Sequence, residues 1–327
     1  MTSNQFSIRL HEARKMMGLS MEKLAELTGG IITKQSISRY EKGLMLPKRV
    51  AKLAMAKALN ISDSYFDGTN ISIDVPMLRT TSNGKLSEDE LQALEAKLSF
   101  WAEQYLAKEK EAGFPTQFNN PIEGTKISTL EDAIHAADLL REKWHCGDGP
   151  IASILRLLER KGIMILAATL PDYVFGMSTW ADKKHPLMIL DFNPEKSPVE
   201  KFRFTAVHEL AHLLLLFPED SPLRLEKRCD LFASFFLLPK LALIEELGSK
   251  KREKITLEEM IDIKELYGAS LAASIIAARD YGIITTEYKR AWYAEHIEPN
   301  PREIGSGHYA FPETLGREKR VNSIIDS

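Results

Sequence analysis

Cysteine is scarce in this sequence: Cys146 and Cys229 are the two cysteines among 327 residues. They lie far apart and lack the spacing of a metal-binding pair, which excludes a disulfide-stabilised secreted scaffold and favours a reducing compartment. Long apolar runs are also missing. Runs such as residues 213–217 are far too short to cross a bilayer, and the first fifteen residues hold no apolar run such as a signal peptide needs. We therefore expect a cytoplasmic protein with no membrane partner.

Charge is unevenly distributed along the chain. The length of 327 residues favours two or more domains, and 44% hydrophobic with 27% charged residues is typical of a globular protein. The net charge is −3, but residues 1–60 hold eleven Lys or Arg and four Glu, so 11 − 4 = +7, and the rest must sum to −3 − 7 = −10. A basic head on an acidic body indicates a polyanionic partner; a solvated basic face is the alternative.

Four short helices are predicted within the basic head. The first ends at Gly18, Ser20 and Thr33 are expected to cap the second and third, and Pro47 opens the fourth. The third buries Ile37 and Tyr40. The fourth is expected to direct four apolar side chains inward: Val50, Leu53, Ala54 and Leu59. Short helices with a tight turn between the second and third are the layout of a helix-turn-helix.

The stretch "GLSMEKLAELTGGIITKQSISRYEKGLMLP", followed by "AKALNISDSYF", resembles the XRE (Cro/C1-type) DNA-binding domain. The resemblance implies a lambda-repressor-like helical fold, a double-stranded DNA operator as partner, and a third helix that enters the major groove. Its contact residues would be Lys34, Gln35, Ser36, Ser38 and Arg39. Gln35 and Arg39 can read base edges, whereas Lys34 and Ser38 suit phosphates. Met21 stands where the family often has Gln, and a protein-binding helical module is the alternative reading.

A long helix is predicted in the middle of the chain. An extended piece at residues 68–79 precedes it, and Ser87 with Glu90 forms a capping box at its start. The helix carries an apolar stripe made of Leu91, Leu94, Leu98, Trp101 and Leu106. Such a stripe favours either a dimer or interdomain strut, which would make the protein a homodimer, or ordinary packing on the next domain. Residues 114–124, rich in Pro and Asn, are the clearest linker.

The C-terminal part is predicted to be mainly helical with a small β-sheet, so the fold class is α+β. A helix leads into a strand within residues 149–170, and alternation with turn signals in residues 173–192 predicts a small antiparallel sheet. Ser197, Pro198 and Glu200 then predict a capped helix start.

The helix that follows contains "VHELAH" in an apolar setting, where ionisable groups are costly unless something pairs with them. His208 and His212 are four residues apart and share one face, so both imidazoles can ligate one tetrahedral Zn²⁺ while Glu209 polarises a water. A third ligand is expected on the returning helix. Glu226 comes back level with the metal, and Asp230, one turn further, can accept the N–H of a ligating histidine. Alternatively, Glu226 and Asp230 simply line a solvated face.

Four segments resemble the ImmA/IrrE-type metallopeptidases, in the order seen in that family: "GPIASILRLLERKGI", "FRFTAVHELAHLLL", "EKRCDLFASFFLLP" and "LYGASLAASIIAARDYGII". The resemblance implies a zincin-like fold with His208, His212 and Glu226 as ligands of one Zn²⁺ per chain, Mn²⁺ being the alternative metal, and Glu209 as general base. The substrate or partner would be a regulatory protein (a repressor, antitoxin or toxin), as in phage or toxin–antitoxin systems. The two resemblances together divide the chain into residues 1–68, 69–127, 128–295 and a tail, 296–327.

Other readings of the site remain open. Cys229 could ligate a metal, but a small buried residue is the favoured role. Peptide hydrolysis also needs an oxyanion stabiliser, for which Tyr267, Tyr288 and His296 are candidates. The competing function is a transcription factor or antitoxin whose metallopeptidase-like domain senses a partner, ligand or metal and cleaves nothing. A zinc-stabilised scaffold without a DNA role conflicts with the basic head.

Overall fold

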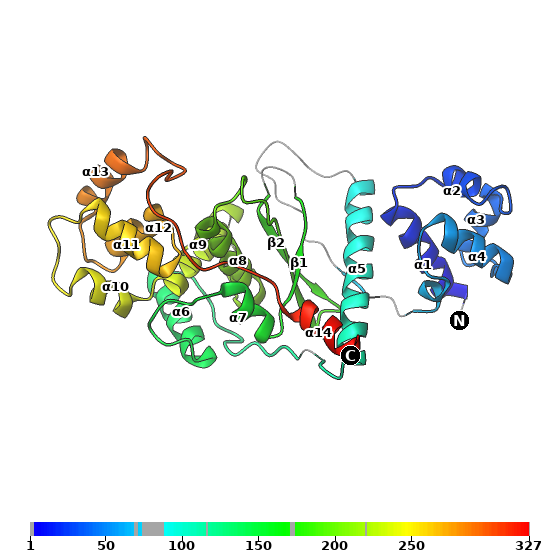
Figure 1. The fold of residues 1–327 in the computed structure, drawn as a ribbon, viewed down its shortest axis with the longest axis horizontal. Helices are drawn as coiled ribbons and strands as arrows, with labels where there is room; N and C mark the ends of the chain where they lie inside the picture. Colours follow the sequence, from blue (N-terminus) through cyan, green and yellow to red (C-terminus); the bar gives the residue numbers. More distant parts are fainter. Residues whose placement is uncertain are drawn as a thin grey trace. The chain divides into compact units, whose positions relative to one another are not determined.

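The structure, a computed structural model, describes residues 3–68, 71–73, 88–115, 117–170, 174–219 and 221–326 (Figure 1). It is mainly helical with one small sheet, which confirms the predicted fold class at that level. The chain forms two compact units. Unit 1 comprises Met1–Thr116, Thr179–Lys184 and Val321–Ser327, and unit 2 comprises Gln117–Ser178 and His185–Arg320. Within the described ranges, no helix is both long and apolar enough to cross a membrane.

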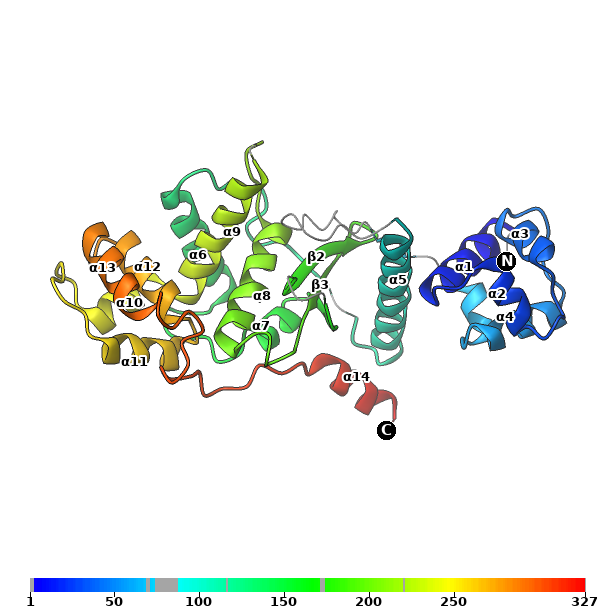
Figure 2. The same ribbon diagram turned by 90° about the horizontal axis from the view of Figure 1, so that it is seen from above.

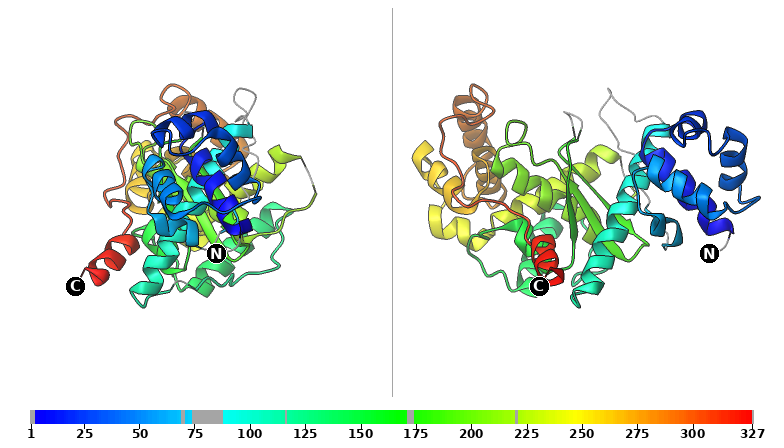
Figure 3. Two further views of the ribbon diagram at one scale, coloured as in Figure 1. Left: turned by 90° about the vertical axis from the view of Figure 1, so that its right-hand side faces the viewer. Right: turned by 45° about the vertical axis from the view of Figure 1, so that its right-hand side comes forward.

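Unit 1 begins with a bundle of short helices: α1 (Ser3–Met16), α2 (Met21–Leu27), α3 (Lys34–Glu41), α4 (Arg49–Ala58) and the 3₁₀ helix η1 (Asp63–Asp67). The right-hand view of Figure 3 shows these blue elements gathered into one cluster. The predicted caps are confirmed: the Ser20 hydroxyl accepts the N–H of Lys23 at 3.1 Å, and the Thr33 hydroxyl accepts that of Ser36 at 3.2 Å. These local hydrogen bonds start the second and third helices where the sequence predicts.

The core of this bundle corrects the prediction for α4. Val50 and Leu53 are 67% and 43% exposed, so they do not point inward. The helix starts at Arg49, and the spacing of Ala51, Met55 and Leu59 sets its inward face instead. Residues 50 and 53 fall off that four-residue spacing. The buried core consists of Phe6, Leu10, Ala13, Leu24, Ile32, Ile37, Tyr40, Met55, Ala56, Leu59, Tyr65 and Phe66.

The long helix α5 (Glu88–Glu111) belongs to unit 1 and packs against α1. Its buried face differs from the predicted stripe: of that stripe only Leu98 is buried, and the others are half-buried. Besides Leu98, the inward positions include Ala102 and Tyr105, which the predicted stripe did not contain. Arg9 of α1, itself buried, donates to Glu103 at 2.6 Å and so ties α5 to the bundle. The predicted cap at Ser87 and most of the extended piece at residues 68–79 lie outside the described residues.

Unit 2 holds the remaining elements, with β2 and α14 each divided between the two units. In chain order they are α6 (Leu130–Trp144), α7 (Ile154–Arg160), β1 (Met164–Ala167), β2 (Gly176–Ala181), β3 (His185–Leu190), α8 (Val199–Leu214), α9 (Pro222–Leu237), α10 (Lys240–Leu247), α11 (Leu257–Tyr267), α12 (Leu271–Asp280), α13 (Thr286–His296) and α14 (Arg317–Ile325). Helix α8 packs on β3 and on α9, and α9 also packs on α6 (Figure 2).

The sheet has the strand order β1-β3-β2. It is a mixed sheet, because β1 pairs with β3 in parallel, with Met164 opposite Leu187. The antiparallel prediction was made for residues 173–192, which hold β2 and β3 alone. Asp182 and Lys183 both have positive φ, and Lys184 N–H bonds to Ala181 C=O at 3.0 Å, which gives the tight turn that joins β2 to β3. The turn fixes the direction of that pair. No such local signal fixes the direction of β1.

Two further features of unit 2 depart from the sequence predictions. The cap of α8 is Pro198 without a side-chain hydrogen bond, and the buried Ser197 hydroxyl has no partner among the described residues. Glu200 does not close a capping box, because it accepts the N–H of Tyr309 at 2.8 Å. The segment predicted as a tail thus contacts α8. Glu313 in the same segment accepts the N–H groups of Ile154 and Leu155, at 2.9 and 3.0 Å, at the start of α7.

Candidate functional site

Helices α8 and α9 bring the predicted metal-site residues together. His208 and His212 lie one turn apart on α8, with ring centroids 5.1 Å apart and their Nε2 atoms 3.2 Å apart. Pro222 occupies the first turn of α9, so the returning helix begins directly after the turn that follows α8. Glu226 and Asp230 lie one turn apart on α9; Glu226 reaches both histidines and Asp230 reaches His208.

Three potential ligand atoms surround one point between the helices. The Oε2 atom of Glu226 lies 3.0 Å from Nε2 of His208 and 3.7 Å from Nε2 of His212, while the two Nε2 atoms are 3.2 Å apart. An ion with tetrahedral bonds of about 2.0–2.1 Å holds its ligands roughly 3.3 Å from one another. The triangle of donor atoms therefore has the size that such an ion requires.

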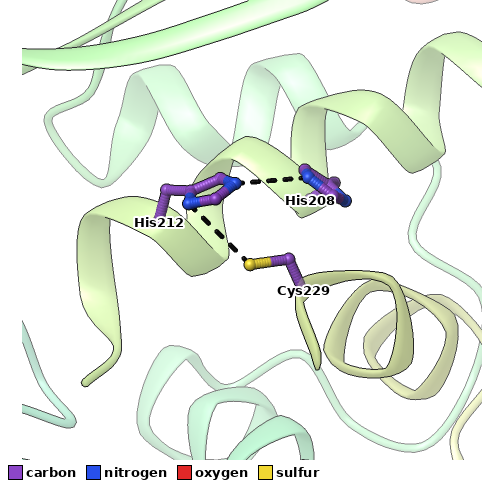
Figure 4. A group of neighbouring side chains, drawn as sticks. All are labelled: His208, His212 and Cys229. Atoms are coloured by element: carbon purple, nitrogen blue, oxygen red, sulfur yellow. Dashed lines mark hydrogen bonds between the residues drawn. The ribbon is translucent and has the colours of Figure 1, made fainter. Parts of the chain in front are cut away.

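The other ring nitrogens are held from behind. Nδ1 of His208 lies 2.8 Å from Oδ1 of Asp230, and Nδ1 of His212 lies 3.8 Å from Sγ of Cys229. In Figure 4 one nitrogen of His212 faces His208 while the other faces the sulfur. Partners at Nδ1 fix the orientation of each ring, so that Nε2 is the atom of each imidazole that could ligate a metal ion.

A second ligand set shares the same histidines. Donor atoms of His208, His212 and Cys229 all lie within 4.8 Å of one another, so these three residues also form a group that could hold a metal ion. The sequence favours a small buried residue as the role of Cys229, whereas the structure places its buried thiol beside His212. The signal for this contact was its position three residues after Glu226, on nearly the same face of α9.

The electrostatics of the cluster favour positive charge between the helices. Burial opposes charge on His208, but hydrogen bonds to Asp230 and Glu226 outweigh it and raise its pKa to about 10. Hydrogen bonds from His208 and His212 lower the pKa of Glu226, and burial raises the pKa of the Cys229 thiol. The carboxylates on α9 therefore stabilise a cation at the point that the imidazoles face, whether it is a proton or a metal ion.

Glu209 follows His208 on α8 and is half-buried. Its Oε2 atom accepts a hydrogen bond of 2.7 Å from the hydroxyl of Ser178 on β2. Sequence reasoning missed Ser178, because only the packing of β2 on α8 brings the two side chains together. The "GMS" pattern at the start of the strand, which puts a small polar residue on the same face as a glycine, was the available signal.

The predicted oxyanion stabilisers have their contacts elsewhere within the described residues. The Tyr267 hydroxyl lies 3.3 Å from Glu246, the Tyr288 hydroxyl bonds to the backbone of Ile255, and the His296 ring lies 4.6 Å from Trp292. None of these contacts reaches the histidines of α8.

Helix α3 presents the predicted DNA-binding residues on its outer side. Lys34, Gln35 and Arg39 are exposed, and Ser36 and Ser38 are half-buried. The ammonium group of Lys34 pairs with Glu22 at the surface. On the inner side, the buried pair of Arg14 and Glu41 joins α1 to the end of α3, with Arg14 donating to Glu41 at 2.6 and 2.8 Å.

The molecule thus combines a bundle of short helices that exposes a polar third helix with a candidate metal site in unit 2. Comparison with known families matches a helix-turn-helix model to residues 10–66, which confirms the predicted N-terminal domain and suggests a DNA-binding transcriptional regulator. No peptidase family is identified for the chain. No curated protein matches it.

Among solved structures, the chain is similar to the crystal structure of ComR from Streptococcus suis. That alignment covers 100% of this chain and 77% of that chain at 15% identity, with a TM-score of 0.19.

Proposed function

We propose that this protein is a DNA-binding transcriptional regulator whose unit 2 is a zinc-dependent metalloendopeptidase. Its substrate would be a regulatory protein, such as a repressor or an antitoxin, and the peptidase would act within a homodimeric regulator. The observation that supports the peptidase most strongly is the triangle of Nε2 of His208, Nε2 of His212 and Oε2 of Glu226, with edges of 3.2, 3.0 and 3.7 Å.

His208, His212 and Glu226 would hold the metal. We favour Glu226 over Cys229 as the third ligand because the sulfur lies at Nδ1 of His212, behind the ring, whereas Glu226 lies at the Nε2 atoms. Two imidazoles and a carboxylate are a donor set found in catalytic zinc sites, and Mn²⁺ is the alternative metal. A zinc ion held there supplies Lewis-acid activation of water and of a carbonyl oxygen.

Glu209 carries the proton transfers in this proposal. Its carboxylate takes a proton from the attacking water as the new C–O bond forms, and it returns that proton to the amine nitrogen as the C–N bond breaks. The side chain is half-buried on the same helix as the histidines, so it can meet both the water and the substrate. A metal that serves only a structural purpose would not need this carboxylate.

The DNA-binding part would use the outer side of α3. Gln35 and Arg39 would read base edges in the major groove. Lys34, Ser36 and Ser38 would contact the phosphate backbone and so position the helix on the DNA. The exposure of Lys34, Gln35 and Arg39 and the charge of +7 over residues 1–60 (11 − 4) support this role.

The test compares wild type with Glu209→Gln. Both proteins should bind about one zinc ion per chain, because the ligands are unchanged. Both should also retard a DNA duplex selected by the wild type from a random-sequence pool. Only the wild type should cleave peptides in a proteome-derived peptide library or the purified product of a neighbouring gene, with mass spectrometry as the readout. Equal cleavage by both proteins would show that Glu209 is not the general base. Absence of zinc from the wild type would refute the metal site.

The His208, His212 and Cys229 group favours a second candidate function. If the thiol completed the ligand set, the site would suit a sensor of metal or partner in a transcription factor or antitoxin that cleaves nothing. Zinc bound by both proteins without any cleavage, together with loss of zinc in Cys229→Ala, would favour this function over the peptidase.

A further inference from the structure

The two oxygen atoms of Glu209 have different surroundings. Oε2 accepts a hydrogen bond of 2.7 Å from the Ser178 hydroxyl, and Ser178 is 8% exposed. Within the part of the chain that the structure describes, no hydrogen bond reaches Oε1. A buried hydroxyl that donates to a carboxylate forms a charge-assisted hydrogen bond, stronger than one between neutral groups. Among the described residues, the carboxylate is therefore held by a hydrogen bond at Oε2 alone.

Strand β2 is shaped to deliver this contact. Gly176 and Ser178 lie two residues apart, and hence on the same face of the strand. A Cβ atom at Gly176 would lie 2.8 Å from Cγ2 of Thr205 and 3.3 Å from Cγ of Glu209. The missing side chain thus allows α8 to approach β2 closely, and Ser178 then meets Glu209 at hydrogen-bond distance.

We propose that Ser178 is a positioning residue, which holds Oε2 of Glu209 so that Oε1 remains the proton acceptor of the peptidase reaction. This inference rests on the proposed function. A carboxylate without this anchor would rotate among several orientations, of which few suit proton transfer. Ser178 itself touches neither the metal ligands nor the substrate in this scheme, and acts through Glu209 alone.

The first test measures steady-state kinetics on the zinc-loaded full-length chain, with the best-cleaved peptide of the library as substrate. Ser178→Ala should lower kcat about 10- to 100-fold and leave KM within roughly twofold, because the lost interaction serves the transition state rather than substrate binding. Ser178→Thr keeps the hydroxyl and suits a strand, so it should restore most of the activity.

The matched control is Ser234→Ala on α9. This serine is also buried, at 7% exposure, but its hydroxyl has no hydrogen-bond partner among the described residues. Its removal should leave kcat and KM near those of the wild type. Zinc content should be the same in all variants. Wild-type kcat in Ser178→Ala, or an equal loss in Ser234→Ala, would overturn the inference.

The second test does not depend on activity. Infrared difference spectra of wild type against Glu209→Gln identify the carboxylate stretching band of Glu209, in both metal-free and zinc-loaded protein. In Ser178→Ala that band should shift, and in Ser178→Thr it should return. An unchanged band would overturn the inference even in an active enzyme. If the wild type cleaves nothing, the proposed peptidase fails, while the band still decides whether Ser178 holds Glu209.

Discussion

At the scale of single residues, the two nitrogens of His208 have separate tasks. Nδ1 meets the carboxylate of Asp230 at 2.8 Å, and Nε2 faces His212 and Glu226. A metal ion that binds Nε2 displaces the proton from that atom, and the hydrogen bond at Nδ1 keeps the remaining proton there, so that the Nε2 lone pair is available to the metal. In the proposed metal site, Asp230 would therefore contribute to metal binding without being a ligand.

Replacing Asp230 by Ala should weaken zinc binding about 10- to 100-fold, because His208 loses the partner that fixes its ring and its tautomer. Competition with a fluorescent zinc chelator measures this affinity on the full chain. Asp262→Ala is the control, since Asp262 is an exposed aspartate on α11. Equal affinities in the two variants would contradict the orienting role of Asp230.

The sequence indicates some residues of the site and not others, for a geometric reason. His208, His212 and Glu209 lie within one turn and a half of a single helix, so their spacing alone places them. The position of Glu226 beside the histidines can be predicted because the turn between the two helices is short and the rise per residue of a helix is known. Ser178 lies on a strand, and apart from the glycine two residues before it, nothing in the local sequence indicates which face of β2 meets α8.

At the scale of elements, the same distinction separates confirmed from wrong predictions. The caps at Ser20 and Thr33 depend on bonds to residues three positions away, and they form as predicted. The inward positions predicted for Val50 and Leu53 and the cap predicted at Ser197 depend on distant packing partners, and these predictions are wrong, whereas Ala54 and Leu59 pack on the core as predicted. Glu200, expected to close a box with Ser197, bonds to Tyr309 across 109 residues instead.

The packing of α3 on α1 should depend on pH through Glu41. Burial alone would raise the pKa of Glu41, but hydrogen bonds from Arg14 and His11 outweigh it and hold the pKa below its ordinary range. A lowered folded-state pKa contributes stability above the ordinary value of about 4.3, and this contribution is lost as the pH falls through the folded-state pKa. Amides of α1 and α3 should therefore lose protection from hydrogen exchange in acid.

Glu41→Gln should remove that acid dependence and lower the stability of this region by about 3–5 kcal/mol, because Arg14 keeps a buried charge without its partner. Hydrogen exchange of the full-length chain, resolved by peptide, measures both effects. Glu26→Gln is the control: Glu26 pairs with Lys23 at the surface, where a lost pair costs about 0.2–1 kcal/mol. If both variants behave alike, the buried pair does not hold α3.

At the scale of the whole chain, the segment from Tyr309 to Glu313 completes unit 2. Glu313 receives a charged hydrogen bond from Arg203 of α8, and both side chains are almost fully buried. Arg203 also donates to the backbone oxygen of Ile151 at 2.7 Å, and its guanidinium carbon lies 4.2 Å from the ring centroid of Tyr309. Contacts between residues more than a hundred positions apart produce no periodic pattern in the sequence. The sequence therefore indicated only a tail here.

Removing the charge of Glu313 should therefore destabilise the helix that carries the candidate metal ligands. Glu313→Gln leaves Arg203 buried without its counter-ion, and we expect a loss of about 3–5 kcal/mol in the free energy of unfolding. Hydrogen exchange of the full chain in low denaturant measures this as lost protection of amides in α7 and α8. Glu318→Gln, at an exposed position of α14, is the matched control and should leave protection unchanged. Equal protection of α8 in both variants would mean that the segment from Tyr309 to Glu313 does not stabilise the helix that carries the candidate metal ligands.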